Sequence, residues 1–260
     1  AEGVGASAVK DGISHAAAIW NPEGDMGDME IWELAEPLLY LGRNIKPNTA
    51  GYGKYRGGSG YESLRMVYGA KDWTMYFMGN GYMASDCGLM GGYPAASGYR
   101  FEAHGTDIKE RIEQRLPIPT GGDSDPDYPE YEENMDAKEI IRDKQSITTE
   151  TVYENYDLYL NYLRGGPGFG DPLERKPSMI QDDLNEGHLL PRYAEKVYGA
   201  VVTQNDKGRY LVDEEKTSLR RAEIRKERLH KAIPAQQWME SEREKIINKE
   251  ASVQVRHMYG

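Results

Sequence analysis

Two basic residues in a glycine-rich stretch are the strongest candidates for chemistry. Residues 51–60 read Gly-Tyr-Gly-Lys-Tyr-Arg-Gly-Gly-Ser-Gly, so five of the ten positions are glycine and two cations stand between them. Glycine lets a backbone approach a ligand closely, and successive amide groups in such a loop can surround an anion. We therefore expect Lys54, Arg56, Gly57 and Gly58 to contact a substrate or another anion.

The same stretch also fits a tight connection between two elements that never meets a ligand. Its cations would then be solvated, or would brace the loop against carboxylates such as Asp171. The spacing G-x-G-x-x-x-G differs by one residue from the dinucleotide fingerprint, and the GK[ST] ending of a P-loop is missing. The stretch therefore does not predict ATP or NAD binding by itself.

Other reactive residue types occur without a known arrangement. Asp25, Asp28 and Glu30 could hold a hard cation through oxygen ligands, but they lack the calcium-loop pattern and we interpret them as solvated loop acids. The one cysteine, Cys87, is either a nucleophile or, as we expect, a buried inert thiol, since no His or Asn is tied to it by a pattern. The histidines are scattered, and we assign no catalytic residue and no metal ligand to this chain.

Strands and turns are predicted on both sides of the glycine-rich stretch. Residues 31–41 fit a helix or a strand, and Pro37 opposes an uninterrupted helix. The runs 63–68 and 73–78 predict two strands joined by a turn as a β-hairpin. Residues 79–98 are dense in glycine and predict an ordered loop.

The second half of the chain is predicted to be mainly helical. Thr148 or Thr149 can cap a helix over residues 150–163, and a second glycine-rich stretch follows. The further expected elements are a helix capped by Ser178 that stops at Gly187, a helix from Pro191 to Tyr198, a hairpin of residues 197–203 and 209–212, and two helices from Glu214 divided by Pro234.

Composition limits the class of protein. The 260 residues suffice for one large or two small domains, and an apolar share of 38% indicates either a largely polar surface or a chain that is completed by partners. The net charge of -11 argues against a nucleic-acid partner, and no stretch approaches the ~20 apolar residues of a membrane helix. No signal peptide is recognised in residues 1–20, and the single cysteine favours a reducing, cytoplasmic compartment.

These patterns predict an α+β fold in two regions. Residues 1–213 combine glycine-rich loops and β-hairpins with short helices, and residues 214–260 form a charged helical tail that docks on partner chains. Within the first region, residues 104–147 read as an acidic insertion, with eight acids between positions 123 and 139. This insertion is either a docking arm or a disordered surface loop.

Three stretches together resemble the hydantoinase B/oxoprolinase family. They are residues 48–60, residues 166–175 (Gly-Pro-Gly-Phe-Gly-Asp-Pro-Leu-Glu-Arg) and residues 198–202 (Tyr-Gly-Ala-Val-Val), in this order. Residues 21–28 and the acidic insertion look most like the large alpha subunit of the ketone-carboxylating branch. The similarity covers almost the whole chain, including the charged tail.

The resemblance implies an ATP-dependent ligase that joins acetone and bicarbonate to acetoacetate. In that branch one subunit uses ATP to form an enol phosphate and carboxyphosphate, and the large subunit forms the carbon–carbon bond beside a manganese ion. The complex, rather than this chain, would bind ATP and manganese. The implied partners are the N-terminal half of the large subunit, an ATP-binding beta-type subunit and a small zinc-binding gamma-type subunit. This chain alone would be inactive.

The chain departs from the family pattern in two ways. The N-terminal portion of the large subunit, in which the family's metal ligands lie, is missing, so we expect a split subunit or cleavage before Ala1. Ala50 stands where many amide-hydrolysing relatives carry glycine, which weakens the match to that branch. Two other functions stay open, an ATP-dependent cyclic-amide hydrolase of the hydantoinase/oxoprolinase type and a purely structural subunit.

Overall fold

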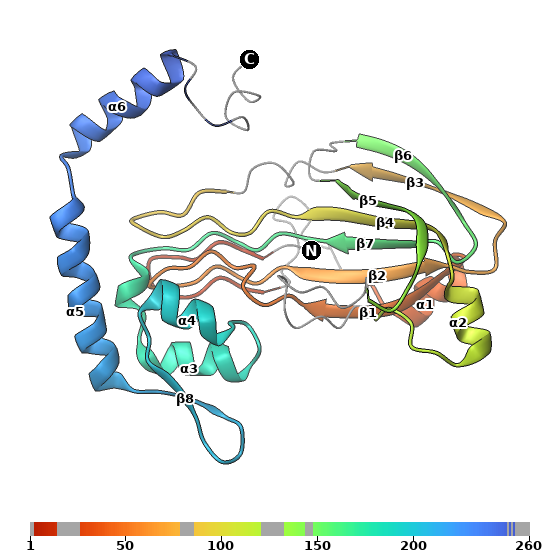
Figure 1. Cartoon of the computed structure of the whole chain (residues 1–260), viewed down its shortest axis with the longest axis horizontal. Helices are drawn as coiled ribbons and strands as arrows, with labels where there is room; N and C mark the ends of the chain where they lie inside the picture. The colour runs from red at the N-terminus through yellow and green to blue at the C-terminus, as the bar shows by residue number, and fades with distance from the viewer. Residues whose placement is uncertain are drawn as a thin grey trace. The chain divides into compact units, whose positions relative to one another are not determined.

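The computed structural model describes residues 3–14, 27–78, 86–120, 133–143 and 148–248, together with residues 250 and 252. The chain divides into two compact units, residues 1–217 and 218–260, and the division falls within helix α5. Most of its elements are labelled in Figure 1. In chain order they are α1 (Met29–Ala35), β1 (Leu38–Ile45), β2 (Tyr61–Val67), β3 (Asp72–Met78), β4 (Tyr99–Thr106), α2 (Ile108–Gln114), β5 (Ala137–Asp143), β6 (Thr148–Glu154), β7 (Leu158–Tyr162), the 3-10 helix η2 (Pro172–Glu174), α3 (Pro177–Asn185), α4 (Pro191–Tyr198), β8 (Val202–Gln204), β9 (Tyr210–Val212), α5 (Glu214–Lys231) and α6 (Ala235–Ile247).

A five-stranded antiparallel sheet forms the centre of the first unit, with the strand order β1-β2-β7-β4-β5 (Figure 1). Strand β2 lies between β1 and β7, and its Arg65 pairs in register with Tyr40 on one side and Tyr159 on the other. Strand β3 pairs with β6, and β8 pairs with β9, both antiparallel. The predicted α+β class is confirmed.

The two faces of the sheet differ because successive side chains of a strand point to opposite sides. The two sides of β2 and β7 therefore bury different kinds of side chain. One carries charged and aromatic groups, and Trp73 and Tyr153 of the β3–β6 ribbon pack against Tyr159 on it. The other is apolar and packs against Ile108 of α2, burying Leu64, Met66, Phe101, Leu158 and Leu160.

A buried ion cluster joins three strands on the charged side of the sheet. The His104 ring lies between two carboxylates, with Nδ1 2.9 Å from Asp157 Oδ2 and Nε2 3.1 Å from Glu102 Oε2. The hydrogen bond to Asp157, followed by the bond to Glu102, raises the pKa of His104 from 6.5 to about 9 despite burial. Asp157 also accepts hydrogen bonds from the N–H groups of Gly105 and Glu154, so it ties the turn before β7 to β4 and β6.

Several predicted elements are confirmed. Pro37 separates α1 from β1, so the run that fits both helix and strand contains one of each. Helix α4, the β8–β9 hairpin and the two helices divided by Pro234 all form. The helix near Ser178 also forms, but its N-cap is Lys176, because Pro177 with its fixed φ suits the first helical position.

The predicted hairpin of residues 63–68 and 73–78 is wrong, although both runs are strands. Both edges of β2 are occupied by β1 and β7, so β3 cannot pair with it. Residues between β2 and β3 instead carry the chain out of the sheet, and β3 pairs with β6, Asp72 opposite Glu154. The missing information was the long-range partner of each strand.

The predicted helix over residues 150–163 is also wrong. The segment forms β6 and β7, which belong to different sheets. β-branched residues such as Thr151 and Val152 favour an extended chain, and this preference prevails over the capping signal. Tyr156 between the strands adopts φ 73, a left-handed conformation that interrupts any helix.

Residues 104–147 contribute to the main sheet. They include the end of β4, helix α2 and the edge strand β5, and Ile108 and Met135 are buried in the core. Positions 121–132, which hold most of the acids, lie outside the described residues. The predicted docking arm therefore stays a prediction, as does the predicted domain boundary at residue 213.

The second unit contains the rest of α5 and all of α6. Its helices expose large apolar side chains, among them Leu229, Trp238 and Ile247. Within the described part of the chain, no helix is long and apolar enough to cross a bilayer.

Candidate anion site beside the glycine-rich loops

The glycine-rich segments pack against one another backbone to backbone. In Figure 1 they extend from the sheet towards α3 and α4. The N-terminal segment 3–14 joins them, since the N–H of Gly58 donates to Val4 O and the N–H of Gly166 donates to Gly58 O, both at 2.8 Å. A Cβ at Gly57 would lie only 1.8 Å from Gly166 O, so glycine is required there by the neighbouring backbone. The two glycine-rich stretches and segment 3–14 therefore form one packed layer, called here the glycine layer.

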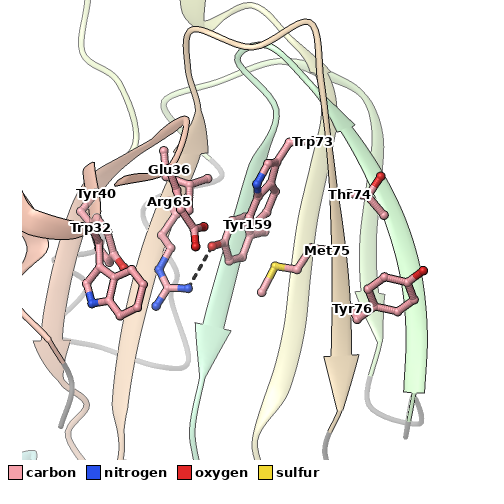
Figure 2. A pocket seen from close by; sticks show the side chains of 10 residues that line it. Trp32, Glu36, Tyr40, Arg65, Trp73, Thr74, Met75, Tyr76 and Tyr159 are labelled. Atoms are coloured by element: carbon pink, nitrogen blue, oxygen red, sulfur yellow. Dashed lines mark hydrogen bonds between the residues drawn. The ribbon is translucent and has the colours of Figure 1, made fainter. Parts of the chain in front are cut away.

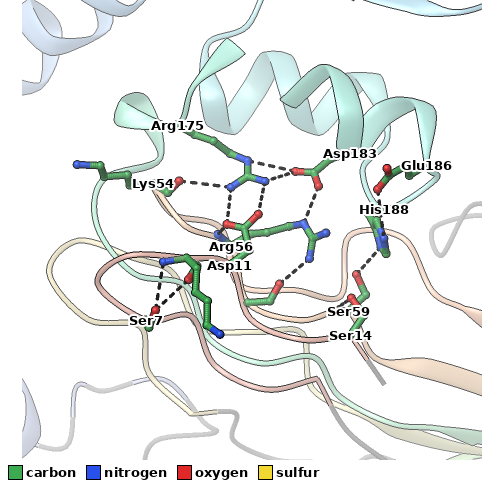
Figure 3. A network of polar contacts seen from close by, with 12 residues as sticks. Ser7, Asp11, Ser14, Lys54, Arg56, Ser59, Arg175, Asp183, Glu186 and His188 are labelled. Atoms are coloured by element: carbon green, nitrogen blue, oxygen red, sulfur yellow. Dashed lines mark hydrogen bonds and ion pairs between the residues drawn. The ribbon is translucent and has the colours of Figure 1, made fainter. Parts of the chain in front are cut away.

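A network of buried ions holds this layer to helix α3 (Figure 3). The guanidinium of Arg175 donates from both terminal nitrogens to Asp11, each bond 2.8 Å long, and its NH2 group also lies 2.6 Å from Asp183 Oδ2. Arg56 donates from Nε to Asp183 Oδ1 at 2.7 Å, so Asp183 lies between two arginines. Arg175 also donates to the carbonyl oxygen of Lys54 at 3.3 Å.

Removing the charges of this network from water costs free energy, because Arg175 is only 1% exposed. Burial alone would lower the pKa of Arg175, but Asp11 and Asp183 outweigh burial and the pKa stands above its ordinary value. Arg175 therefore stays charged, and its two carboxylates fix segment 3–14, η2 and α3 relative to one another.

Beside this network lies a cavity of about 350 Å³ whose lining is rich in lysine. It includes Lys10, Lys54 and Lys176 together with the carboxylates of Asp11 and Glu174. Asp11 is already paired with Arg175, so the lining keeps an excess of positive charge. An ammonium group is a strong donor to phosphate or carboxylate oxygens, so this cavity can hold an anion.

The structure separates the four residues that the sequence groups together. Lys54 lines the cavity, and Figure 3 shows its side chain pointing away from the buried network. Its Nζ lies 3.6 Å from Glu174 Oε2 in a half-exposed ion pair. Arg56 is engaged with Asp183, and the N–H groups of Gly57 and Gly58 donate to backbone carbonyls of the layer.

The second interpretation, in which the cations brace the loop, has a clear counterpart in the geometry. The bracing carboxylates are Asp183 for Arg56 and Glu174 for Lys54. Asp171, the carboxylate predicted for this role, accepts the N–H of Leu173 and caps η2.

Sequence reasoning missed the residues that complete the site. Lys10 and Asp11 lie in a segment of small residues that predicts only a loop, and Lys176 follows the second glycine-rich stretch. Arg175 ends that stretch and Asp183 lies in the helix after it, but no spacing rule connects either residue to Asp11. Lys10 and Asp11 have a local signal, because they are charged within a run of small residues. Arg175 and Asp183 stand beside other charged residues and have none.

Three other groups of reactive side chains stand apart from this cavity. Ser59 Oγ lies 3.0 Å from His188 Nδ1, but Ser59 is fully buried and no substrate can reach it. Cys87 is exposed, so the predicted buried thiol is wrong, because its loop lies on the surface of the glycine layer. Asp25 lies outside the described residues, Asp28 caps α1, and among the described residues no three His, Cys, Asp or Glu side chains form a metal-binding group.

Residues 1–172 match the sequence profile of the hydantoinase B/oxoprolinase family, so the chain belongs to this family, as its motifs predict. It is 62% identical over 259 residues to the acetone carboxylase alpha subunit of Xanthobacter autotrophicus, covering 100% of this chain and 33% of that protein. It is 28% identical over 243 residues to the acetophenone carboxylase delta subunit of Aromatoleum aromaticum, covering 91% and 34%. The chain thus spans about a third of the length of the curated relatives that it matches.

Solved structures agree with the sequence comparison. The nucleotide-free structure of acetone carboxylase superimposes with a TM-score of 0.88 at 62% identity, covering 99% of this chain and 34% of that one. The ATP-dependent caprolactamase from Pseudomonas jessenii superimposes with a TM-score of 0.58 at 20% identity, over 85% and 32%. The second likeness shows a shared fold alone.

Proposed function

We propose that this chain is part of the large subunit of an ATP-dependent ketone carboxylase that converts acetone and bicarbonate to acetoacetate. The observation that carries the proposal is the 62% identity to an acetone carboxylase alpha subunit over the whole of this chain. The lower identity of 28% to an acetophenone carboxylase subunit favours a small aliphatic ketone over an aromatic one. As a third of such a subunit, the chain would be inactive alone.

The lysine-rich cavity gives this chain a role beyond scaffolding. Carboxylation through phosphorylated intermediates requires cations near the phosphate and carboxylate oxygens and exclusion of water from carboxyphosphate. Lys54, with Lys10 and Lys176 beside it, supplies such cations. The cavity is not lined by Arg56, Gly57 or Gly58. These residues fix the loop that carries Lys54.

The metals and nucleotide of the reaction belong to other parts of the assembly in this proposal. The manganese site lies in the part of the large subunit outside this chain, as the family resemblance implies. ATP is bound by a beta-type subunit and zinc by a small gamma-type subunit. The assembly is cytoplasmic and contacts neither nucleic acid nor membrane.

The charged tail docks on these partner chains. Helices α5 and α6 expose Leu219, Leu229, Trp238, Met239 and Ile247, which is unusual for helices in contact with water alone. Contacts with other subunits would bury these side chains, and the surrounding charges would set the register of docking.

Two other functions are separable from this one. A cyclic-amide hydrolase would share the fold, as the caprolactamase does, but would not use bicarbonate. A purely structural subunit would need its buried ion network but not Lys54. We assign the bracing role to the network and the anion contact to Lys54, so the two roles rest on different residues.

The test is substrate-dependent ATP hydrolysis by the native assembly that contains this chain. Acetone, butanone, acetophenone and caprolactam are compared with and without bicarbonate, and acetoacetate is measured enzymatically. We expect hydrolysis with acetone to depend on bicarbonate and to yield acetoacetate. Hydrolysis with caprolactam and without bicarbonate would assign the chain to the amide-hydrolysing branch.

A further inference from the structure

A second cavity, separate from the lysine-rich one, lies between α1, the sheet and β3 (Figure 2). Its volume is about 380 Å³, and rings of Trp32, Tyr40, Trp73, Tyr76 and Tyr159 contribute to its lining. Aromatic rings provide large apolar area with fixed geometry, which is typical of recognition surfaces. A single arginine, Arg65, stands among these rings.

Two tyrosines fix the orientation of the Arg65 guanidinium. Its Cζ lies 4.8 Å from the ring centre of Tyr40 and 5.3 Å from that of Tyr159. Its NH1 group donates to the hydroxyl of Tyr159 at 2.9 Å. This orientation follows from the strand register, because Arg65 is paired with both tyrosines across β1, β2 and β7. The two tyrosine rings pack against the guanidinium and Tyr159 engages NH1, so the rest of the edge is left for a ligand.

The charge of Arg65 has no carboxylate partner within the described residues. Glu36 lines the same cavity but forms no ion pair with it, and the buried Nε of Arg65 has no hydrogen-bond partner in the described part of the chain. Leaving a buried donor unsatisfied is costly, and native proteins avoid it. A carboxylate placed at the edge of the guanidinium would satisfy both Nε and the charge.

Apolar side chains are exposed at the rim of this cavity and on the elements that form it. Tyr76, at the rim on β3, is 64% exposed, and elsewhere on α1 Ile31 is 64% and Leu34 89% exposed. Val152 on β6, which lies opposite Thr74 of β3, is also exposed. Exposed apolar side chains of this kind around one partly buried cation are typical of a protein interface rather than of a small-molecule pocket.

We propose that this cavity, named here the Arg65 pocket, receives a segment of the remaining large subunit that presents an Asp or Glu carboxylate beside an apolar side chain. About two thirds of the length of the matched relatives lies outside this chain, so a large polypeptide is available to cover the rim. The proposal rests on the chain being part of a larger subunit and not on the reaction that the subunit catalyses.

The test is site-specific photocrosslinking in the intact assembly. Tyr76 is replaced by p-benzoylphenylalanine, the assembly is purified and irradiated, and the linked peptides are identified by mass spectrometry. Lys207, exposed in the turn between β8 and β9, receives the same probe as a matched control. We expect Tyr76 to link to one peptide of the remaining large subunit that contains Asp or Glu, and the Lys207 probe to give at most a tenth of that yield.

The variant Arg65→Gln, combined with the probe at Tyr76, tests the carboxylate contact. We expect the crosslinking yield to fall at least about fivefold, because the amide cannot pair with the partner's charge. Circular dichroism and the unfolding temperature of the variant control for misfolding, and Arg65→Lys should retain part of the yield. Links to a second copy of this chain, to another subunit or to nothing, or an undiminished yield in Arg65→Gln, would overturn the proposal.

Discussion

Asp11 and Arg175, which stand 164 positions apart, form a bidentate ion pair in which each terminal nitrogen of Arg175 lies 2.8 Å from one carboxylate oxygen of Asp11. This pair joins the N-terminal segment to the end of the second glycine-rich stretch. Because Asp183 shares the same guanidinium, one side chain fixes three distant parts of the chain around the loop that carries Lys54.

Removing the guanidinium of Arg175 should destabilise the chain strongly. Arg175→Met leaves two carboxylates near one another without their buried cation, and breaking such a pair costs about 3–5 kcal/mol. Urea unfolding measures the change. Lys216→Met, which breaks an exposed pair with Asp213, is the control and should leave the unfolding midpoint unchanged. Equal stability of Arg175→Met and the unmutated chain would mean that the network does not hold the layer.

Glycine at position 57 should be irreplaceable for steric reasons. In Gly57→Ala the new Cβ would meet the carbonyl oxygen of Gly166, and because neither backbone can move aside, we expect a cost at the upper end of the usual ~1–3 kcal/mol for overpacking. Gly69→Ala is the control: its φ of 82 strains the backbone of the variant, but the new Cβ meets nothing within 4 Å, so the change should cost only about 1 kcal/mol. The two unfolding midpoints are compared in urea, and the packed layer predicts that Gly57→Ala is the less stable variant.

Lys54 should be required for activity and dispensable for folding. It is half-exposed, so loss of its pair with Glu174 should change stability by less than about 0.5 kcal/mol in Lys54→Ala. Loss of a charged contact to an anion should lower kcat/KM by about tenfold or more. Lys207→Ala serves as the matched control. If Lys54→Ala retained activity within twofold, Lys54 would be a bracing residue only.

The stability of the first unit should fall between neutral and alkaline pH through His104. Its folded pKa of about 9 exceeds the ordinary value of 6.5, because the imidazolium donates from both nitrogens to Asp157 and Glu102. The stabilising contribution is therefore complete below pH 6.5 and is lost as the pH rises through about 9. Unfolding free energies at several pH values across this window should decrease in the unmutated chain and be flatter in His104→Gln. An equal slope in both would contradict the assignment.

The sequence predicted elements best where the signal is local. Pro37, Pro234 and the turn at Gly208 mark real boundaries, because each acts on its own backbone. The partners of β2 and β3 were not predictable, since pairing depends on residues far along the chain. The same limit explains the error at residues 150–163, where β-branched residues outweigh a capping signal.

The candidate site divides in the same way. Lys54 and Arg56 stand out in the sequence as charged residues within a glycine-rich stretch. The fold is needed to show that Lys54 lines a cavity whereas Arg56 pairs with Asp183. Asp11 and Arg175 meet through long-range packing that no spacing predicts. Gly57 and Gly58 read from sequence as groups open to an anion, whereas their N–H groups are used within the backbone layer.

The most direct measurement is incorporation of labelled bicarbonate by the native assembly containing this chain, supplied with ATP, manganese and acetone. Acetone carboxylation predicts label in acetoacetate, absent without ATP or acetone and reduced about tenfold or more in Lys54→Ala. No fixed label with any small ketone, together with ATP-coupled opening of a hydantoin, oxoproline or caprolactam ring, would contradict the account.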